Sequence, residues 1–203
     1  MRAIRRLIAA AAVAGLFLVP AASAAASAAP AGKAVWLTGG DTSLSTAPGI
    51  AAALLGHGIV PIATLPGTEG ASIGSGGVTV RFTFPVTGGK VNLQKLTGTI
   101  DHQGGILFVD PATGKQILVS DFVINLKQAV LTAAVNGNPK VRVPLLRLGL
   151  GHIRVQAGQH FVRVSGIVAR LTKTAASALD ATFGTTLFTA GLELGTASTL
   201  LRF

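Results

Sequence analysis

The chain contains no cysteine and no tyrosine. The absence of cysteine excludes disulfide bonds, cysteine-ligated zinc and thiol catalysis. It also excludes an N-terminal lipid anchor of the lipoprotein type, which requires a cysteine at the cleavage site. A chain of this length can bury roughly 70% of its unfolded surface, so covalent cross-links are not needed for stability.

Acidic residues are also scarce, since 7 Asp and Glu stand against 17 Lys and Arg. Few carboxylates leave few pairs for general acid–base chemistry of the glycosidase kind. The segment GSGGV at 74–78 lacks the strand–turn–helix setting of a serine nucleophile elbow, although the spacing of residues does not decide whether a Ser–His–Asp triad assembles in space. We therefore predict a protein that is not an enzyme and has no catalytic residues. The carboxylates are Asp41, Glu69, Asp101, Asp110, Asp121, Asp180 and Glu193.

The four histidines have no metal-binding spacing. His57, His102, His152 and His160 do not pair at two or four residues apart, and the motif HExxH is absent. His152 and His160 flank a predicted turn at 156–159, so they could approach each other across a hairpin. Two imidazoles alone make a weak, open site. We predict no metal site.

A long apolar run occurs only at the N-terminus. Three arginines precede about 13 apolar residues, fewer than the roughly 20 that a membrane-spanning helix needs. Ala22, Ser23 and Ala24 then fit the small-x-small rule for cleavage. We predict a signal peptide over 1–24, cleaved near Ala24, with an uncleaved anchor as the alternative. A disordered Ala-rich lead-in over 25–32 and a single β-rich domain over 33–203 would follow.

The predicted location is therefore secreted or extracytoplasmic, without a transmembrane segment in the mature chain. The net charge of +10 falls to +7 when the three arginines of the signal peptide are removed. Outside the cytoplasm a basic surface meets anionic cell-wall polymers, lipid headgroups or acidic ligands, and nucleic acid is not an expected partner. Because the basic residues are spread along the chain, a role in solubility alone is the alternative.

Most of the chain alternates between apolar and polar residues. In GVTVRFTFPV at 77–86, valines and phenylalanines occupy every second position, which is typical of a half-buried strand. Turn sequences such as TGGK at 87–90 and DPATGK at 110–115 separate further runs of this kind. The pattern predicts a mainly β fold, an antiparallel β-sandwich or barrel-like domain with two short helices. The other predicted strands are 33–37, 96–100, 105–109, 116–125, 129–135, 141–151, 152–156, 160–171, 185–194 and 197–203.

The two helices are predicted from capping residues and apolar spacing. The first lies within 45–58, with Thr46 as its cap and a glycine at its end. The second lies within 172–184, with Thr172 or Thr174 as its cap and Gly184 just past its end. The sequence LPGTE at 65–69 is interpreted as a turn, because it is internal and lacks the tail of a wall-sorting signal.

The dipeptide Asp101-His102 precedes Gly104 and Gly105 at the predicted end of a strand. Neighbouring side chains on a strand point to opposite faces, so these two cannot form a base and its orienting partner. A turn and a solvated strand edge explain them without any function. A ligand site is the alternative, and it depends on a family resemblance.

The segments GKVNLQKLTGTIDHQGGILF and LTAAV, within residues 78 to 195, resemble a group of secreted actinobacterial β-rich proteins. More distantly, they are similar to the HtaA-type haem-binding domain, in which a β-run leads to a turn with histidine and glycine. Most of the shared positions are turn glycines and alternating apolar residues.

This resemblance implies haem held through a tyrosine that a histidine assists. His102 falls near the family's histidine and is the tentative cofactor-binding residue, but no tyrosine is present. Trp36 falls where the family begins with a tryptophan, and a buried aromatic anchor explains it equally well. We therefore expect a secreted, non-catalytic binding or structural protein of the cell envelope with a basic surface. Its partner would be an anionic cell-wall polymer or a small apolar ligand; the alternative is a haem-binding protein of haem uptake, with haem as its cofactor.

Overall fold

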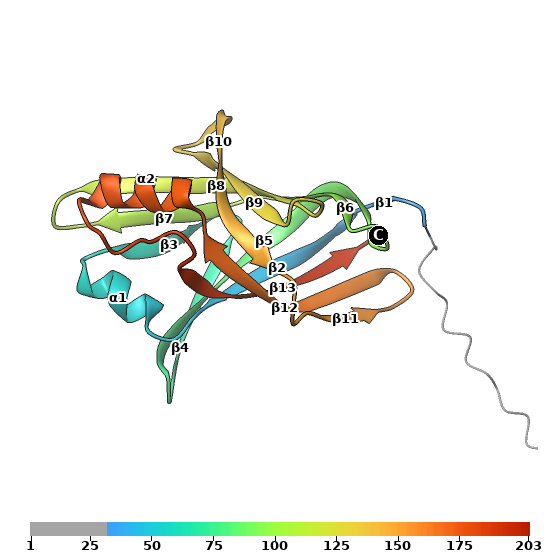
Figure 1. The fold of residues 1–203 in the computed structure, drawn as a ribbon, viewed down its shortest axis with the longest axis horizontal. Helices are drawn as coiled ribbons and strands as arrows, with labels where there is room; N and C mark the ends of the chain where they lie inside the picture. The colour runs from blue at the N-terminus through green and yellow to red at the C-terminus, as the bar shows by residue number, and fades with distance from the viewer. Residues whose placement is uncertain (1–31) are drawn as a thin grey trace, which may run out of the picture.

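The computed structural model describes residues 32–203, whose strands form one 13-stranded antiparallel sheet (Figure 1). The predicted signal peptide over 1–24 and the lead-in as far as residue 31 lie outside the described residues. The elements are β1 (Val35–Trp36), β2 (Gly39–Thr46), α1 (Ile50–Gly56), β3 (Val60–Thr64), β4 (Thr68–Gly74), β5 (Gly77–Asn92), β6 (Thr97–His102), β7 (Gly105–Asp110), β8 (Lys115–Asn125), β9 (Val130–Val135), β10 (Asn138–Gly149), β11 (Arg154–Ala157), β12 (Phe161–Leu171), α2 (Lys173–Phe183) and β13 (Glu193–Arg202).

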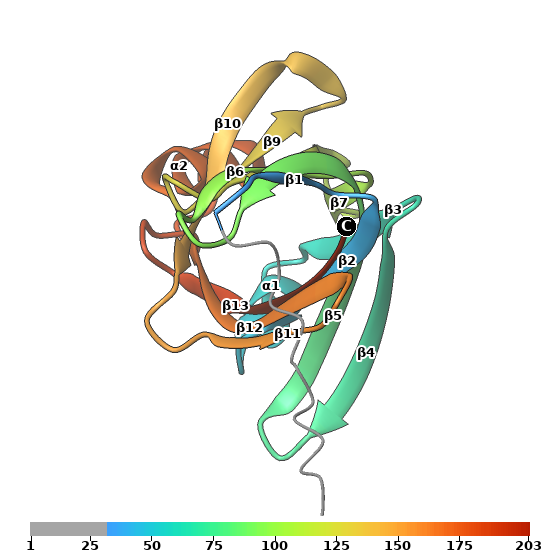
Figure 2. The same cartoon turned by 90° about the vertical axis from the view of Figure 1, so that its right-hand side faces the viewer.

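Part of the sheet closes on itself into a barrel, which Figure 2 shows end-on. Hydrogen-bonded neighbours run in the order β5–β2–β13–β12–β10–β9–β8, and β6 then pairs with both β8 and β5. The hairpins β4–β5 and β9–β10 project from the barrel in both views. The predicted fold, mainly β and antiparallel with a barrel-like closure and two short helices, is confirmed.

The helix α2 forms as its capping residues predict. The Thr172 side chain accepts a hydrogen bond from the Ala175 N–H at 3.1 Å, and Gly184 ends the helix in the left-handed conformation at φ 69°. The prediction that Thr46 caps α1 is wrong. Thr46 pairs with Gly195 as the last residue of β2, so the helix begins only after Gly49, which has φ 83°.

The strand prediction missed three strands and began one, 185–194, before the strand that the structure has there. β2 and β4 are rich in glycine, serine and threonine, and every residue of β4 is exposed, so neither shows a buried alternating face. The short strand β3 was missed as well. Residues 185–192 form a connection instead of a strand, and the Asp180 carboxylate accepts a hydrogen bond from Phe188 N–H at 3.0 Å. Asp180 is half-buried, and its carboxylate holds this connection against α2.

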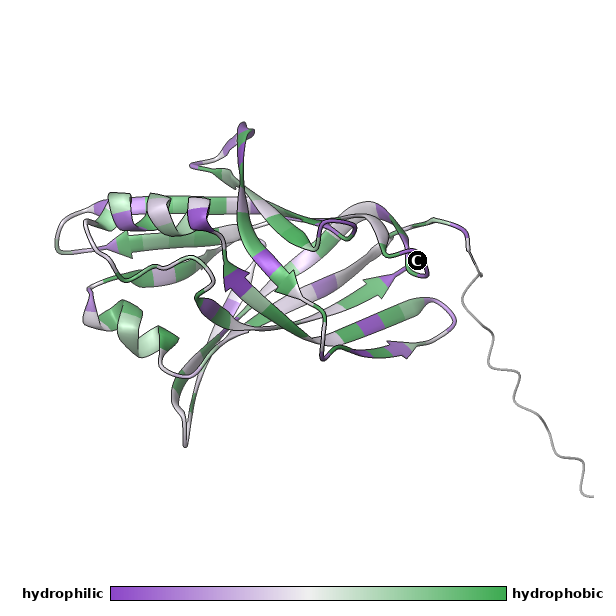
Figure 3. Ribbon diagram, viewed as in Figure 1, coloured by the Kyte–Doolittle hydropathy of each residue, from purple (hydrophilic) through white to green (hydrophobic). Residues whose placement is uncertain are grey.

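Two hydrophobic clusters fill the interior. The larger lies between the sheet and the two helices, and it includes Phe84 and Phe122, whose rings meet edge-on at 4.8 Å. Figure 3 shows hydrophobic positions recurring along the strands and along α1. The smaller cluster consists of Leu37, Val86, Val91, Ile100, Ile124 and Leu201. Within residues 32–203, no helix is both long and apolar enough to cross a membrane.

Candidate functional site: an apolar cavity beside a buried histidine

A cavity of about 100 Å³ lies inside the barrel, within the larger hydrophobic cluster. Its wall draws on strands from around the ring and on both helices. Residues Ile50, Ala51 and Leu54 of α1 close one side, and Leu179 of α2 contributes to the wall. Figures 1 and 2 together place α1 at the end of the barrel opposite the C-terminus.

The cavity wall is almost entirely hydrocarbon. Among its lining residues only Thr42 and Thr46 carry a polar side-chain atom. The Thr46 hydroxyl accepts from the Val80 N–H at 3.0 Å, and the Thr42 hydroxyl lies 2.7 Å from His102 Nε2 and 2.8 Å from the Thr199 hydroxyl. Both hydroxyls are therefore satisfied by the protein, and within the described residues no buried side-chain nitrogen or oxygen lacks a partner.

His102 lies behind the cavity wall and is 4% exposed. Its Nδ1 lies 3.2 Å from the carbonyl oxygen of Phe122, which can only accept, so the neutral ring carries its proton on Nδ1. Nε2 then accepts from the Thr42 hydroxyl, which is also within hydrogen-bond distance of the Thr199 hydroxyl. The three side chains form a row of hydrogen bonds that joins β6, β2 and β13.

Burial lowers the pKa of His102 below its ordinary value of 6.5, because the charged imidazolium loses its hydration. The Phe122 carbonyl and the negative charge of Asp101 act in the opposite direction, but desolvation is the larger effect. His102 is therefore neutral at pH 7, which matches the hydrogen-bond assignment.

The structure tests one of the two roles considered for the Asp101-His102 dipeptide, the solvated strand edge. The side chains do point to opposite faces, but His102 is buried, so the expectation of a solvated edge is wrong for it. The turn after it is closely packed. A Cβ on Gly104 would lie 2.7 Å from Gly67 N, and one on Gly105 would lie 2.4 Å from the Val119 carbonyl oxygen, so both positions require glycine.

The remaining residues that the sequence singled out do not converge. His152 lies beside Gly166, whereas His160 lies at the other end of β11, where its carbonyl accepts from Phe203 N–H, so these two histidines do not meet. Asp110 holds its turn as predicted, since its carboxylate accepts from Ala112 N–H at 2.9 Å. Between residues 32 and 203, no three His, Asp or Glu side chains gather as a metal site would require.

Trp36 is not the buried anchor that the resemblance allowed. Its side chain is 68% exposed, on the outer face of β1. The cavity itself has no sequence motif, because alternation shows which residues point inward but not whether they fill the interior.

The fold and the cavity thus define an antiparallel β-barrel with an apolar interior. Its structure is similar to that of the C-terminal domain of HtaA from Corynebacterium glutamicum, with a TM-score of 0.54 and 17% sequence identity over 82% of this chain and 98% of that chain. A histidine-to-alanine variant of the same domain, solved as a domain-swapped dimer, gives a TM-score of 0.46 at 20% identity over 68% of this chain and 84% of the other. No family model and no curated protein matches the sequence. The similarity establishes a shared fold, as the sequence resemblance predicted.

Proposed function

We propose that the protein is a non-catalytic, extracytoplasmic binding protein that takes a small, uncharged apolar molecule into the barrel cavity. The observation that supports this proposal is the hydrocarbon wall of the cavity, whose two hydroxyl groups already have protein partners. Such a wall offers a ligand apolar contact and no hydrogen bond, so it favours ligands without polar groups.

The size of the cavity limits the ligand. In an engineered protein, a dry apolar cavity of roughly 150 Å³ binds benzene. The volume here, about 100 Å³, is of the same order and suits one aromatic ring or a short alkyl chain. Larger ligands would have to extend out of the open part of the cavity or displace side chains of its wall.

The absence of catalysis is part of the proposal. Hydrolytic or acid–base chemistry needs polar groups that converge on a substrate. In the part of the chain that the structure describes, the cavity wall contains no His, Asp, Glu, Lys or Arg. The extracytoplasmic location rests on the basic, apolar and small-residue order of the first 24 residues.

Haem is the ligand that the family resemblance implies, and several observations favour a smaller ligand. The chain has no tyrosine to bind iron, and His102 is absent from the cavity wall. Both ring nitrogens of His102 are hydrogen-bonded, so iron binding through His102 would break a bond to Thr42 or to the Phe122 carbonyl.

The test compares toluene with phenol by differential scanning calorimetry. Toluene should raise the Tm by roughly 2–4 °C, corresponding to about 1 kcal/mol of linked binding energy at a modest excess over Kd. Phenol has nearly the same shape but would bury a hydroxyl without a partner, so it should stabilise less. The protein should not shift or sharpen the Soret band of hemin, and a shift that His102→Ala weakens would favour the haem alternative.

Two variants that fill the cavity test whether toluene binds there. Ala197→Leu and Leu44→Phe place extra carbon in the wall and should abolish the toluene shift. Ala178→Leu, on the exposed face of α2 and away from the cavity, should keep it. An equal shift in all three variants, or no shift in the unmodified protein, would contradict the proposal.

A further inference from the structure

The end of the barrel remote from α1 carries an exposed tryptophan among lysines. Trp36 on β1 pairs with Lys90 on β5, and the Lys90 ammonium lies 4.8 Å from the centre of the indole ring. This cation–π contact covers one face of the ring, while 68% of the side chain stays exposed. Leu37 and Val91, the next residues on the two strands, point inward to the smaller cluster.

The buried side chain of Asn92 joins this strand pair to the neighbouring turn. Its amide donates to the Gly32 carbonyl at 3.1 Å, and its oxygen accepts from the Lys95 N–H at 2.9 Å. The β5–β6 turn thereby lies next to the start of β1, with Lys95 and Leu96 at its tip. Leu96 is 47% exposed and has φ 48°, so the turn itself directs an apolar side chain into solvent.

The β8–β9 turn lies beside the β5–β6 turn, because β6 pairs with both β5 and β8. Leu126 N–H donates to the Gly98 carbonyl at 3.1 Å, and the exposed Lys127 follows. Three segments at this end, 33–36, 90–97 and 126–129, contain no acidic residue. We call these side chains the lysine–tryptophan end: Lys33, Trp36, Lys90, Lys95, Leu96 and Lys127.

We propose that the lysine–tryptophan end docks on an anionic phospholipid surface. The lysines would contact the phosphate groups, and the Trp36 ring and the Leu96 side chain would enter the boundary between headgroups and acyl chains. Tryptophan is favoured at that depth because its ring is apolar and its N–H stays hydrated. Lysines extend their stems along apolar surface while their ammonium groups remain at the charged layer.

The two exposed apolar side chains favour a lipid surface over a cell-wall polymer. A polyanion can satisfy the lysines, and a sugar ring can stack on an indole. A cell-wall polymer offers no apolar layer into which an exposed leucine could insert, whereas a bilayer does. This docking surface is separate from the cavity, from which the smaller hydrophobic cluster divides it.

The chain has a built-in reporter, because Trp36 is its only tryptophan. The test uses the chain from Ala25 onward, which contains every described strand and helix. Vesicles of phosphatidylglycerol mixed with phosphatidylcholine should shift the Trp36 emission to shorter wavelength and should carry the protein down on sedimentation. Vesicles of phosphatidylcholine alone should do neither, and added salt should reverse the binding.

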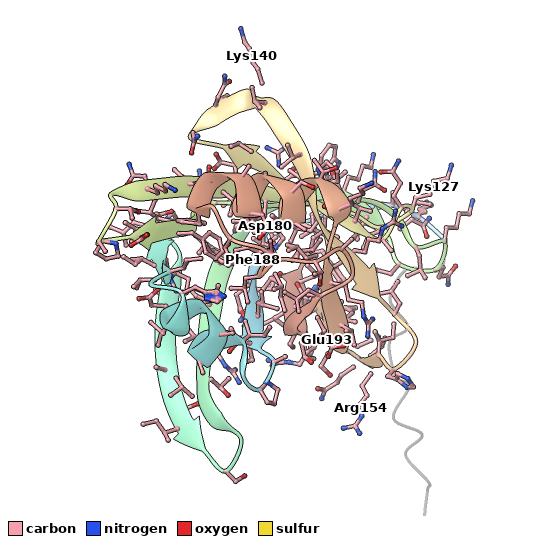
Figure 4. All side chains as sticks on the ribbon, turned by 60° about the vertical axis from the view of Figure 1, so that its left-hand side comes forward. Lys127, Lys140, Arg154, Asp180, Phe188 and Glu193 are labelled. Atoms are coloured by element: carbon pink, nitrogen blue, oxygen red, sulfur yellow. The ribbon has the colours of Figure 1, made fainter. Side chains whose placement is uncertain are left out.

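Matched variants separate this surface from net charge. Lys95→Ala with Lys127→Ala should weaken sedimentation with anionic vesicles roughly 30-fold. Lys115→Ala with Lys140→Ala removes the same charge elsewhere and should leave binding nearly unchanged; Figure 4 shows Lys140 on the projecting β9–β10 hairpin, apart from Lys127. Leu96→Asn suits a positive φ and should weaken binding without disturbing the turn.

Three outcomes would overturn the proposal. The first is an emission maximum that anionic vesicles do not move. The second is equal binding by the two lysine pairs, which would indicate a response to net charge alone. The third is binding to soluble polyphosphate as tight as to vesicles, with unchanged Trp36 emission, which would identify a polyanion surface.

Discussion

At the scale of single residues, the buried His102 couples the stability of the barrel to pH. Its pKa is lowered chiefly by desolvation, so protonation favours the unfolded chain. The stability that neutral His102 contributes is complete above its unfolded-state pKa of about 6.5. It is lost as the pH falls below that value toward the lower pKa of the folded state.

We therefore expect the urea midpoint of the protein to be lower at pH 5 than at pH 7.5. His102→Gln should be less stable by about 1–3 kcal/mol at pH 7.5, because a buried hydrogen-bond partner is lost. It should also show a weaker decrease between the two pH values, since glutamine does not titrate. His160→Gln, which changes an exposed histidine, should keep the full decrease. A full decrease in His102→Gln would assign the effect to another group.

At the scale of elements, α2 depends on one cap. Thr172 accepts from Ala175 N–H, and its hydroxyl also donates to the Pro144 carbonyl on β10, so the same side chain starts the helix and fixes it to the barrel. Thr174, the other cap that the sequence allowed, is exposed within the first turn. Sequence spacing allowed either threonine as the N-cap of α2. Because the helix starts directly after β12, Thr172 is the residue in the cap position.

Thr172→Ala should lower the free energy of unfolding by about 1–3 kcal/mol, because it removes the cap and leaves the Pro144 carbonyl without its partner. Thr172→Ser should restore most of this loss. Thr174→Ala should stay within about 0.5 kcal/mol of the unmodified protein. Chemical denaturation of the three variants tests the assignment, and equal losses at both positions would reject it.

At the scale of the whole molecule, β13 joins the two ends of the described chain. It pairs with β12 on one side and with β2 on the other, where Thr199 lies opposite Thr42, so it brings together segments from the two ends of the described chain. Without it, both neighbours would present unpaired edges and the apolar interior would be open.

A chain truncated after Gly191 should therefore lack a cooperative thermal transition and should aggregate. Removing Phe203 alone leaves β13 intact and should preserve the transition. Circular dichroism during heating, with the soluble fraction measured alongside, distinguishes the two chains. A cooperative transition near the original Tm in the first chain would show that β13 is dispensable.

Local patterns were sufficient for much of this fold. Alternation in β5, β8 and β12 predicted strands because each buries one face, and the Asp110 turn and the α2 cap depend on neighbours in the sequence. β2 and β4 were missed because their pairing is made by the backbone, with few apolar side chains to mark it. Thr46 was misassigned because the strand partner Gly195 lies far along the chain.

For the candidate sites too, some features follow from the sequence and others only from the tertiary structure. The sequence by itself determined that the protein has no thiol chemistry, no tyrosine ligand, a basic balance and apolar ribbons with a period of two, because these follow from which residues are present and from their order. Only the tertiary structure decided that His102 is buried between Thr42 and Phe122, that Trp36 faces solvent beside Lys90, and that the barrel interior keeps a cavity. The physical reason is that burial and empty volume depend on how strands distant in the sequence pack against each other when the barrel closes. The local order of residues does not determine that packing.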